Sequence, residues 1–486
     1  MIKFTNELLF LNFFIFNIMG GFYGVVSKTD CVKEIFYGTD YHSHLGTKRA
    51  GMVFIANGKG FKRSIHTIEN SYFRTKFESE LQEFSGNSGM GIISDTDPQP
   101  ILFTSHLGRF AIVTVSRVLN IAELEKRILL GKKHLTENFE GNTNPTEMIA
   151  SLICEKDTFV DGIENVFENI KGSCSLMILT ENGIIAARDK LGRTPVVIGK
   201  KEGAYAVASE SCSFPNTGFE LDYFMGPGEI VQVTAEGFSR LREPGEKMQI
   251  CSFLWVYYGY PPSYYEGINV EECRYRCGAA LARRDSVDAD FVCGIPDSGV
   301  GHAIGYSNEK KIPNKRAYSK YTATWPRSFL PSFQEQRDLV ARMKLVPNKA
   351  IIKGKKIIFI DDSIVRGTQL KENTNDMRKS GAMELHMRIA CPPLLYPCDF
   401  LNFTQSRTPM ELAGRRAIKQ MNGDDSNLQE YSDPDSEKYR EMVKKIAENL
   451  DLSSLIYQRL DDLIESIGLP KEKLCTHCWD GSSYFK

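Results

Sequence analysis

The stretch Ile357–Thr368 constrains the fold of this chain more than any other part of the sequence. Its first four residues, Ile357–Ile360, are apolar and predict a buried strand of a parallel sheet. Two adjacent carboxylates, Asp361 and Asp362, follow where that strand would end, and a short loop then leads into a predicted helix over Leu370–Lys379. Strand, loop and helix in this order are typical of an open α/β sheet, which binds ligands at the carboxyl ends of its strands.

The loop between the predicted strand and helix has the composition of a phosphate site. Backbone N–H groups at a helix N-terminus favour a phosphate group. The two carboxylates beside them can face the hydroxyls of a ribose or a hydrated Mg²⁺ ion. The stretch therefore predicts a site for a phosphorylated sugar, and the alternative is an ordinary acidic turn that caps a helix.

These residues resemble the phosphoribosyl-pyrophosphate (PRPP) loop of type I phosphoribosyltransferases, and most closely that of the amidophosphoribosyltransferases, which are glutamine PRPP amidotransferases. The resemblance implies that Asp361 and Asp362 hold the ribose hydroxyls and Mg²⁺. It also implies that the loop after them wraps the 5′-phosphate of PRPP. That loop consists of Ser363, Ile364, Val365, Arg366, Gly367 and Thr368.

A second motif repeats the pattern of a strand followed by a loop of small residues. The predicted strand Phe291–Ile295 runs into Pro-Asp-Ser-Gly and then into a predicted helix. Pro-Asp-Ser-Gly alone is also a common turn. The resemblance implies that Asp297, Ser298 and Gly299 line the pyrophosphate of PRPP, and that Ser298 joins the two carboxylates at Mg²⁺.

A basic segment follows, and two of its residues are the predicted catalytic contacts. The resemblance implies that Arg327 belongs to a lid over bound PRPP and that Lys344 contacts the pyrophosphate, where cations would stabilise the leaving group. The alternative is a solvated basic face of a helix. The family lid carries Asn-Arg-Tyr ahead of its Arg, whereas this chain has Tyr321–Pro326, so lid closure or the nucleophile that it admits is expected to differ.

Cysteines near the C-terminus form a Cys-x-x-Cys motif, which alone fits zinc, a redox pair or a structural role. The chain resembles a subset of the family, similar to enzymes of Gram-positive bacteria, that holds a [4Fe–4S] cluster on four cysteines. The resemblance implies the ligands Cys251, Cys398, Cys475 and Cys478. Zinc on the same four ligands is the alternative.

The first half of the chain resembles the N-terminal-nucleophile glutaminase domain of the same family. Short apolar runs alternate with Gly-rich turns and predict sheets interleaved with helices. The resemblance rests on motifs that include Arg188–Gly192 and Ala208–Cys212. In the family, processing exposes an N-terminal Cys whose thiol attacks the glutamine amide. Gly20 stands at that position here, and glycine has no thiol.

Two further parts of the family's glutaminase site are also replaced. The Arg-Tyr-Ser-Thr segment gives way to different residues around Ile92–Thr96, and the Asn-Gly oxyanion donors give way around Val115–Arg117. Three losses within one site predict that glutamine hydrolysis is absent.

The predicted fold class is α/β, with an N-terminal-nucleophile (αββα) glutaminase-like domain followed by a doubly wound type I phosphoribosyltransferase domain. The expected divisions are 1–19, 20–245, 246–450 and 451–486. The first is an apolar leader or a start assigned too far upstream, with Met19 as the initiator, and the last is a C-terminal helix with the Cys-x-x-Cys tail. Helical spacing from Leu452 to Ile467 predicts that helix, and the polar run Gly423–Glu437 predicts a flexible connection.

Composition excludes some classes of partner. The 486 residues carry a net charge of −1, so no overall basic field favours nucleic acid. The apolar start Phe4–Ile18 is shorter than the roughly 20 residues of a membrane helix, which makes a membrane location unlikely on length alone. The 12 cysteines are scattered rather than framed in pairs, which favours a reducing compartment and a cytoplasmic location.

The sequence therefore predicts a diverged amidophosphoribosyltransferase of purine biosynthesis that forms 5-phosphoribosylamine and pyrophosphate from PRPP, with ammonia rather than glutamine. The alternative is a catalytically reduced paralogue that binds PRPP or nucleotides and regulates a true amidotransferase. A salvage phosphoribosyltransferase is disfavoured, because such chains lack a glutaminase half. Purine nucleotide effectors, and a homo-oligomer or a mixed oligomer with a paralogue, are the other expected partners.

Overall fold

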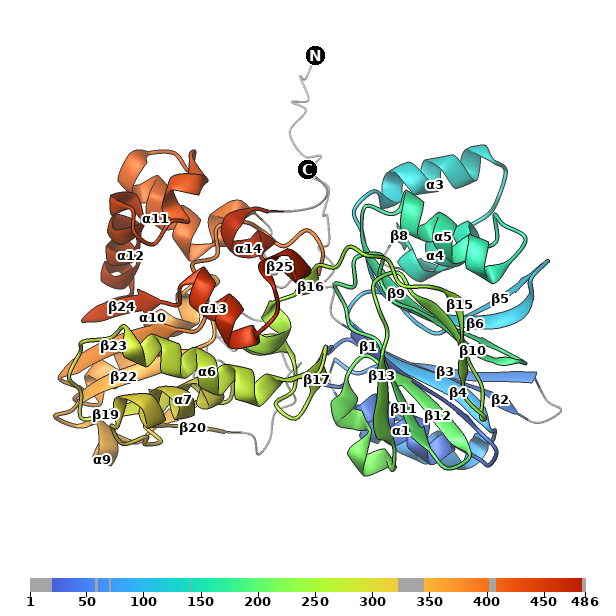
Figure 1. Cartoon of the computed structure of the whole chain (residues 1–486), viewed down its shortest axis with the longest axis horizontal. Coiled ribbons are helices and arrows are strands. Elements are labelled where there is room, and N and C mark those ends of the chain that lie inside the picture. The colour runs from blue at the N-terminus through green and yellow to red at the C-terminus, as the bar shows by residue number, and fades with distance from the viewer. Residues whose placement is uncertain are drawn as a thin grey trace, which may run out of the picture.

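The computed structural model of the chain describes residues 20–56, 60–69, 71–139, 141–321, 345–401 and 408–482. They form two α/β domains that lie side by side (Figure 1). We call residues 20–245 the first domain and the described residues from 246 onward the second domain. The predicted leader 1–19, Arg327 and Lys344 lie outside the described residues.

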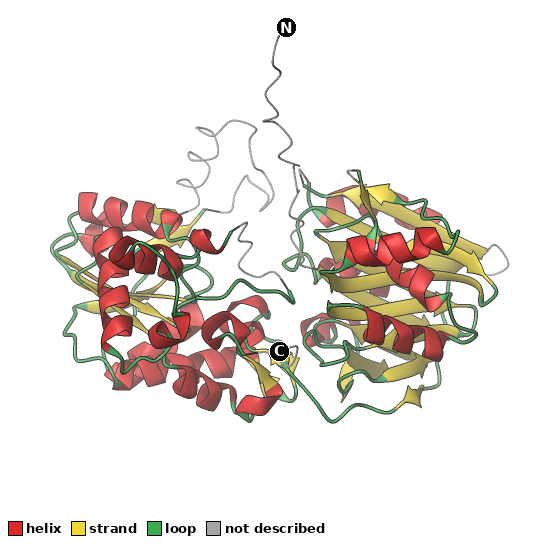
Figure 2. Cartoon of the chain, turned by 90° about the horizontal axis from the view of Figure 1, so that it is seen from above, coloured by secondary structure: helices red, strands yellow, loops and turns green. Residues whose placement is uncertain are grey.

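The first domain contains two antiparallel sheets. In spatial order the larger sheet consists of β13 (Glu220–Phe224), β11 (Val197–Lys201), β12 (Ala204–Ala208), β1 (Gly20–Ser27), β4 (Ser88–Ser94), β2 (Arg49–Ala56) and β3 (Gly60–Thr67). The smaller sheet consists of β15 (Phe238–Arg242), β14 (Ile230–Val233), β10 (Gly183–Ala187), β9 (Gly172–Thr180), β6 (Gly108–Val118) and β5 (Ile101–Ser105). The two sheets face each other across an apolar core (Figure 2).

Alternation along the strands explains why both faces of each sheet are covered. On β1, Phe22 points into the core between the sheets, whereas Tyr23 and Val25 point to the opposite face and pack with α1 (Val32–Asp40). The smaller sheet is covered on its outer face by three helices, and this completes four layers in the order helix, sheet, sheet, helix. Those helices are α3 (Ile121–Leu130), α4 (Pro145–Ile153) and α5 (Phe159–Asn169).

Shorter elements complete the first domain. They are α2 (Phe73–Phe77), η1 (Glu78–Glu83), η2 (Ser211–Ser213), η3 (Pro215–Thr217), β7 (Asn138–Phe139) and β8 (Asn142–Thr143).

The second domain is built on a four-stranded parallel sheet. The strand order is β19 (Phe291–Gly294), β22 (Lys356–Asp361), β23 (Glu384–Ile389) and β24 (Ser454–Tyr457). On β22, Ile358 and Ile360 pack against helices on one face, and Ile357 and Phe359 pack in the main core on the other face. Because both faces are buried, the strand is apolar without alternation, as its sequence predicts.

Helices lie on both faces of this sheet, so the prediction of a doubly wound domain is confirmed. The described helices of the second domain are α6 (Val270–Arg283), α7 (Val300–Lys310), α9 (Lys349–Ile352), α10 (Thr368–Lys379), α11 (Ala413–Asn422), α12 (Glu437–Leu450), α13 (Leu460–Ile467) and α14 (His477–Asp480). The short turns are η4 (Leu254–Tyr258, a π-helix), η5 (Pro409–Glu411), η6 (Leu428–Tyr431) and η7 (Lys471–Lys473). The two-stranded pairs are β16 (Ile250–Cys251) with β25 (Leu474–Cys475), β17 (Tyr264–Tyr265) with β18 (Ile268–Asn269), and β20 (Tyr318–Lys320) with β21 (Leu345–Pro347).

Two predictions on local structure were wrong. The helix expected from Leu452 begins only at Leu460, because residues 454–457 form β24 at the edge of the sheet. A segment of four residues such as Ser454–Tyr457 is too short to show a period that separates strand from helix. The polar segment 423–437 is not a free connection, since it contains η6, whose Tyr431 is 1% exposed and accepts a hydrogen bond from Asn422 Nδ2 at 2.5 Å.

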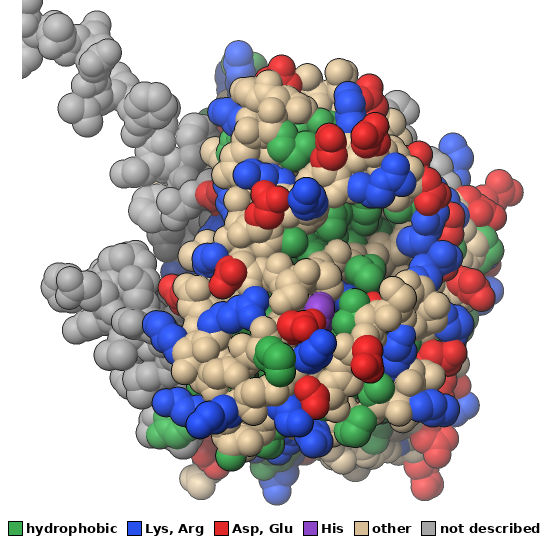
Figure 3. Space-filling model, turned by 90° about the vertical axis from the view of Figure 1, so that its left-hand side faces the viewer, with side chains coloured by type: hydrophobic (Ala, Val, Ile, Leu, Met, Phe, Trp, Pro, Cys, Tyr) green, Lys and Arg blue, Asp and Glu red, His purple; other side chains and the backbone are tan. Residues whose placement is uncertain are grey.

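Two observations bear on partners. No described helix is both long and apolar enough to cross a membrane. Figure 3 shows the outer face of the second domain, where side chains of Lys and Arg are interspersed with those of Asp and Glu. This face therefore matches the near-zero net charge of the whole chain.

Candidate functional site

Two loops meet at the carboxyl ends of the neighbouring parallel strands β19 and β22. Ser298 Oγ, from the first loop, donates a hydrogen bond to Asp361 Oδ1 at 2.9 Å. In the second loop, Ser363 Oγ donates to Asp362 Oδ2 at 2.5 Å, and the N–H of Asp362 donates to Asp361 Oδ1 at 3.0 Å. The structure thus brings together the serine and the two carboxylates that the sequence analysis placed in one site.

The loop after β19 is pressed against the end of β22. A Cβ atom on Gly299 would lie 2.0 Å from the carbonyl oxygen of Ile360, so this position requires glycine. The N–H of Ile295 donates to that same oxygen at 2.8 Å. Asp297, the remaining predicted residue of this loop, has a carboxylate that is 70% exposed and ion-paired with Lys320.

The middle of the loop after β22 is held by buried contacts, whereas Arg366 and Thr368 near its end are exposed. Ile364 is 4% exposed in the core, and the carbonyl oxygen of Val365 accepts a hydrogen bond from the N–H of Ala413 at 2.8 Å. Arg366 lies outward and forms an ion pair with Glu411 at 2.6 Å.

The open end of that loop leads directly into a helix. Gly367 has a φ of +74°, a left-handed conformation that glycine adopts without strain, and α10 begins at Thr368. The N-terminus of α10, with the positive end of its helix dipole, therefore follows the two carboxylates closely along the chain, which suits an anion site.

The two carboxylates of the acidic pair are buried and repel each other. Burial raises the pKa of Asp361 and Asp362, and the charge of Asp362 raises the pKa of Asp361 further. Two buried carboxylates that repel each other are stabilised by a bound cation, and oxygen ligands suit Mg²⁺. Among the residues that the structure describes, no three His, Cys, Asp or Glu side chains are arranged around one ion position. The oxygen atoms gathered here are those of the two carboxylates and of Ser298, whose Oγ donates to Asp361.

Arg274 is a residue of this site that sequence reasoning missed. It is 4% exposed on α6, and its charge lowers the pKa of Asp362 against the effect of burial. Its guanidinium donates to the carbonyl oxygens of Trp255 at 3.0 Å and of Tyr257 and Gly259 at 2.9 Å. No signal in the sequence points to it, because the burial of Arg274 depends on how α6 packs against segments distant in the chain.

The structure also brings the four predicted cysteines into one cluster. Cys251 and Cys475 are paired across β16 and β25, and the thiols of Cys398 and Cys478 are in hydrogen-bonding contact. That contact and burial raise the pKa of Cys478, and burial together with the neighbouring thiols raises the pKa of Cys251. Burial also raises the pKa of Cys475 to about 11, although the nearby Arg193 acts in the opposite direction. Four neighbouring thiols are a donor set whose chemistry suits a metal centre. Among the described residues, no three of these side chains are already arranged around one ion position.

Gly20 lies at the start of β1 beside a small cavity of about 30 Å³. A Cβ atom on Gly20 would lie 2.8 Å from the carbonyl oxygen of Ile93, so a side chain at this position requires a shift of β4. A volume of this size holds one or two water molecules. Both domains contribute to the lining, which consists of Gly20, Leu45, Val115, Thr194, Pro195, Ser209, Glu210, Leu254, Tyr258, Tyr265 and Leu401.

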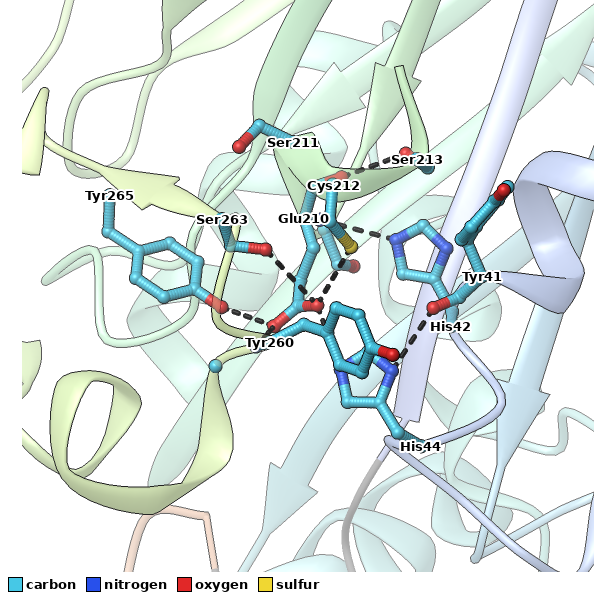
Figure 4. A network of polar contacts seen from close by, with 12 residues as sticks. Tyr41, His42, His44, Glu210, Ser211, Cys212, Ser213, Tyr260, Ser263 and Tyr265 are labelled. Atoms are coloured by element: carbon cyan, nitrogen blue, oxygen red, sulfur yellow. Dashed lines mark hydrogen bonds and ion pairs between the residues drawn. The ribbon is translucent and has the colours of Figure 1, made fainter. Parts of the chain in front are cut away.

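A buried polar network next to this cavity joins the two domains (Figure 4). Glu210, from the first domain, pairs with His44 Nε2 at 2.8 Å and accepts hydrogen bonds from the hydroxyl of Tyr265 and from the N–H of Tyr260 at 3.3 Å. Burial alone would raise the pKa of Glu210, but His44 and Tyr265 outweigh it and lower the pKa to about 2. His42 Nε2 accepts from the N–H of Glu210 at 3.2 Å. The carboxylate is therefore charged and fully engaged in holding the domains together.

Comparisons with known proteins found relatives that match the first domain and others that match nearly the whole chain. The model of the glutamine amidotransferase domain family matches residues 88–216. The chain is 30% identical to the amidophosphoribosyltransferase of Methanothermobacter thermautotrophicus over 475 residues, which cover 95% of this chain and 93% of that protein. It is 30% identical to the amidophosphoribosyltransferase of Bacillus subtilis over 392 residues, which cover 78% of this chain and 80% of that protein. The solved glutamine PRPP amidotransferase of B. subtilis, complexed with ADP and GMP, matches with a TM-score of 0.81 at 27% identity and covers 96% of this chain and 97% of that one.

The first domain has the two sheets of a glutamine amidotransferase fold. The second domain, with its parallel sheet and paired acidic loop, has a type I phosphoribosyltransferase fold. The chain belongs to the amidophosphoribosyltransferase family. The predictions of the fold class and of a pentosyltransferase enzyme are confirmed at this level.

Proposed function

We propose that this chain forms 5-phosphoribosylamine and pyrophosphate from PRPP, as a step of purine biosynthesis, and that it takes ammonia rather than glutamine as the nitrogen donor. The observation that carries the first half of the proposal is the contact of Ser298 with Asp361 at the end of two adjacent strands. Family membership supports the same reaction.

Each part of PRPP has a group of complementary chemistry at this site. The N-terminus of α10 and the loop after Asp362 suit the 5′-phosphate, and the carboxylates suit the ribose hydroxyls. The close-packed loop 297–299 suits the pyrophosphate. Mg²⁺, held by Ser298, Asp361 and Asp362, would neutralise charge on the pyrophosphate as it leaves. Arg327 and Lys344, which lie outside the described residues, are proposed as the cationic contacts of that leaving group.

The buried carboxylates and Arg274 contribute positioning rather than bond making. Displacement at the ribose C1 by an amine needs the two reactants held in line and water kept away from an oxocarbenium-like centre. Arg274 fixes three backbone carbonyls around η4 while its charge faces Asp362. Its charge therefore opposes the rise in the pKa of Asp362 that burial causes.

The second half of the proposal, loss of glutamine hydrolysis, rests on Gly20. The family mechanism needs a thiol on the N-terminal residue, and glycine at this position has none. The cavity beside Gly20 is lined mainly by apolar side chains, together with Glu210. Apolar side chains and the Glu210 network fill the surroundings.

We further propose that Cys251, Cys398, Cys475 and Cys478 hold a [4Fe–4S] cluster. An all-thiolate set of four suits this cluster, and zinc on the same ligands is the competing occupant. Iron and acid-labile sulfide in protein purified without oxygen would support the cluster, and zinc alone would contradict it.

Regulation by purine nucleotides is proposed from one of the matched structures, since the B. subtilis protein was solved with ADP and GMP bound. A homo-oligomer or a mixed oligomer with a paralogue is proposed on the same family grounds. Added ADP or GMP should then lower the rate of pyrophosphate release, and light scattering should report more than one chain per particle.

The deciding experiment gives the anaerobically purified chain PRPP and Mg²⁺ with either ammonium or glutamine, and measures pyrophosphate. We expect release with ammonium only. Release with glutamine at a similar rate contradicts the loss of the glutaminase. No release with either donor, together with intact PRPP binding, favours the alternative of a catalytically reduced regulator.

A further inference from the structure

Arg193 of the first domain lies against the four-cysteine cluster of the second domain. Its side chain is 1% exposed. Its guanidinium is in hydrogen-bonding contact with the thiol of Cys475. It is also close enough to Cys251 for its charge to oppose the rise in pKa that burial and the neighbouring thiols cause there. A positive charge from one domain therefore meets sulfur donors from the other.

The backbone of Arg193 is fixed from both sides. Asp189 Oδ2 accepts hydrogen bonds from the N–H of Leu191 at 3.1 Å and from the N–H of Arg193 at 3.0 Å, which closes a tight turn. The carbonyl oxygen of Arg193 accepts from the N–H of Cys251 at 3.2 Å. The main chain of the arginine is thus hydrogen-bonded to the segment that carries one of the cysteines.

Its side chain is oriented just as firmly. The guanidinium carbon lies 3.7 Å from the centre of the Phe400 ring, a cation–π contact, and Nη2 donates to Gln249 Oε1 at 3.0 Å. Phe400 is two residues from Cys398, and its carbonyl oxygen accepts from Ser173 Oγ of the first domain at 2.8 Å. The arginine, the phenylalanine and the cysteine segment therefore form one packed interface.

Net charge explains what such an arginine does. Four thiolates place several negative charges in a buried site, and burial makes each charge costly unless it is compensated. Groups just outside the metal ligands tune the affinity of a centre and its reduction potential through charge and through hydrogen bonds to sulfur. Arg117 of the first domain adds a second positive charge near Cys398.

We propose that Arg193 is a positioning residue for the four-cysteine centre: it compensates the thiolate charge from across the domain interface, so that the centre is complete only when the two domains are docked. The inference rests on the proposed occupancy of the four cysteines. It assigns to the first domain, which has no nucleophile at position 20, a role that does not depend on glutamine.

The test compares the full chain with Arg193→Gln and Arg193→Lys, all purified without oxygen. The readouts are iron and sulfide per chain and the reduction potential of the centre. We expect Arg193→Gln to shift the potential to more negative values and to lose iron faster to a chelator, because a compensating charge is gone. Arg193→Lys should restore most of the potential, since lysine keeps the charge, while Arg283→Gln, an exposed arginine on α6, should match the wild type.

A second probe keeps the inference testable if the centre takes zinc or if one variant folds poorly. Titration of the metal-free chain with Co²⁺ reports thiolate binding by absorbance, and Arg193→Gln or Arg193→Met should weaken it by about 10- to 100-fold. The role of Arg193 would be overturned if the wild type, Arg193→Gln and Arg193→Met had the same reduction potential, the same iron retention and the same Co²⁺ affinity. That result would leave the proposed metal centre itself standing. A wild-type chain that binds neither iron nor Co²⁺ at its thiols would overturn the occupied centre as well.

Discussion

At the scale of single residues, the acidic pair is a case in which stability is given up for binding. Burial and mutual repulsion raise the pKa of both Asp361 and Asp362. Asp361→Asn removes one of the repelling charges and keeps the shape of the side chain. We therefore expect a higher melting temperature without ligand and, because a charged contact to Mg²⁺ and ribose is lost, a PRPP affinity about 10- to 100-fold lower.

Two measurements on the wild type and Asp361→Asn check this expectation. Calorimetry in the presence of Mg²⁺ gives the affinity for PRPP, and thermal melting gives the melting temperature without ligand. Asp376→Asn on α10 removes a carboxylate that forms only a 4.0 Å pair with Lys379, and it should change neither quantity much. A variant of Asp361 that binds PRPP as tightly as the wild type would remove the acidic pair from the proposed site.

His42 gives the stability of the chain a specific dependence on pH. Burial lowers the pKa of His42 from 6.5 to about 4, so the unfolded chain takes up this proton first. The neutral ring accepts from the N–H of Glu210 and is hydrogen-bonded to the carbonyl oxygen of Gly38 at 2.7 Å. Its contribution to stability is present above pH 6.5 and is lost as the pH falls toward 4, a difference of about 3 kcal/mol.

Urea midpoints measured between pH 7 and pH 4 test this dependence. His42→Gln cannot titrate, so its midpoint should fall less over that range than the midpoint of the wild type. His134→Gln, at an exposed position, should follow the wild type. Equal slopes for wild type and His42→Gln would show that His42 is not buried in the neutral form.

At the scale of elements, sequence reasoning succeeded where one local rule decided the outcome. The apolar run Ile357–Ile360 became a central strand because both of its faces are covered, and the loops after β19 and β22 met because the strands are parallel neighbours. It failed at β24, where a four-residue run is too short to show a period. It also missed Arg274, because which carbonyls and carboxylates a helix side chain meets depends on packing between distant segments.

The loop after β19 yields a prediction at the same scale. Gly299→Ala places a methyl group 2.0 Å from the carbonyl oxygen of Ile360. The clash is with main-chain atoms, so it is relieved only if the whole loop moves. We expect a loss of stability of a few kcal/mol and a loss of PRPP binding larger than that of Gly237→Ala, where no atom lies within 4 Å. Binding and melting curves that are unchanged in Gly299→Ala would mean that the loop does not pack against β22 as described.

At the scale of the whole molecule, the contacts that join the domains are buried and directional. Besides Arg193, the network around Glu210 takes donors from both domains, with His44 on one side and Tyr260 and Tyr265 on the other. Such a network holds only when all partners are present, since an unpaired buried charge is costly. These contacts can therefore hold the first domain tightly against the second domain whether or not the first domain hydrolyses glutamine.

Tyr265→Phe tests this attachment because it removes one hydroxyl and leaves the ring in place. The Glu210 carboxylate loses a donor, which we expect to cost about 1–3 kcal/mol. Amide hydrogen exchange should then rise together in the His44 loop and in residues 254–265, on opposite sides of the interface, while β22 and β23 keep their protection. Tyr264→Phe is the matched control, since the neighbouring tyrosine is 43% exposed. If exchange rose in only one domain, the hydroxyl would stabilise that domain rather than the junction, and Arg193 with the four cysteines would be left as the main tie between the two halves.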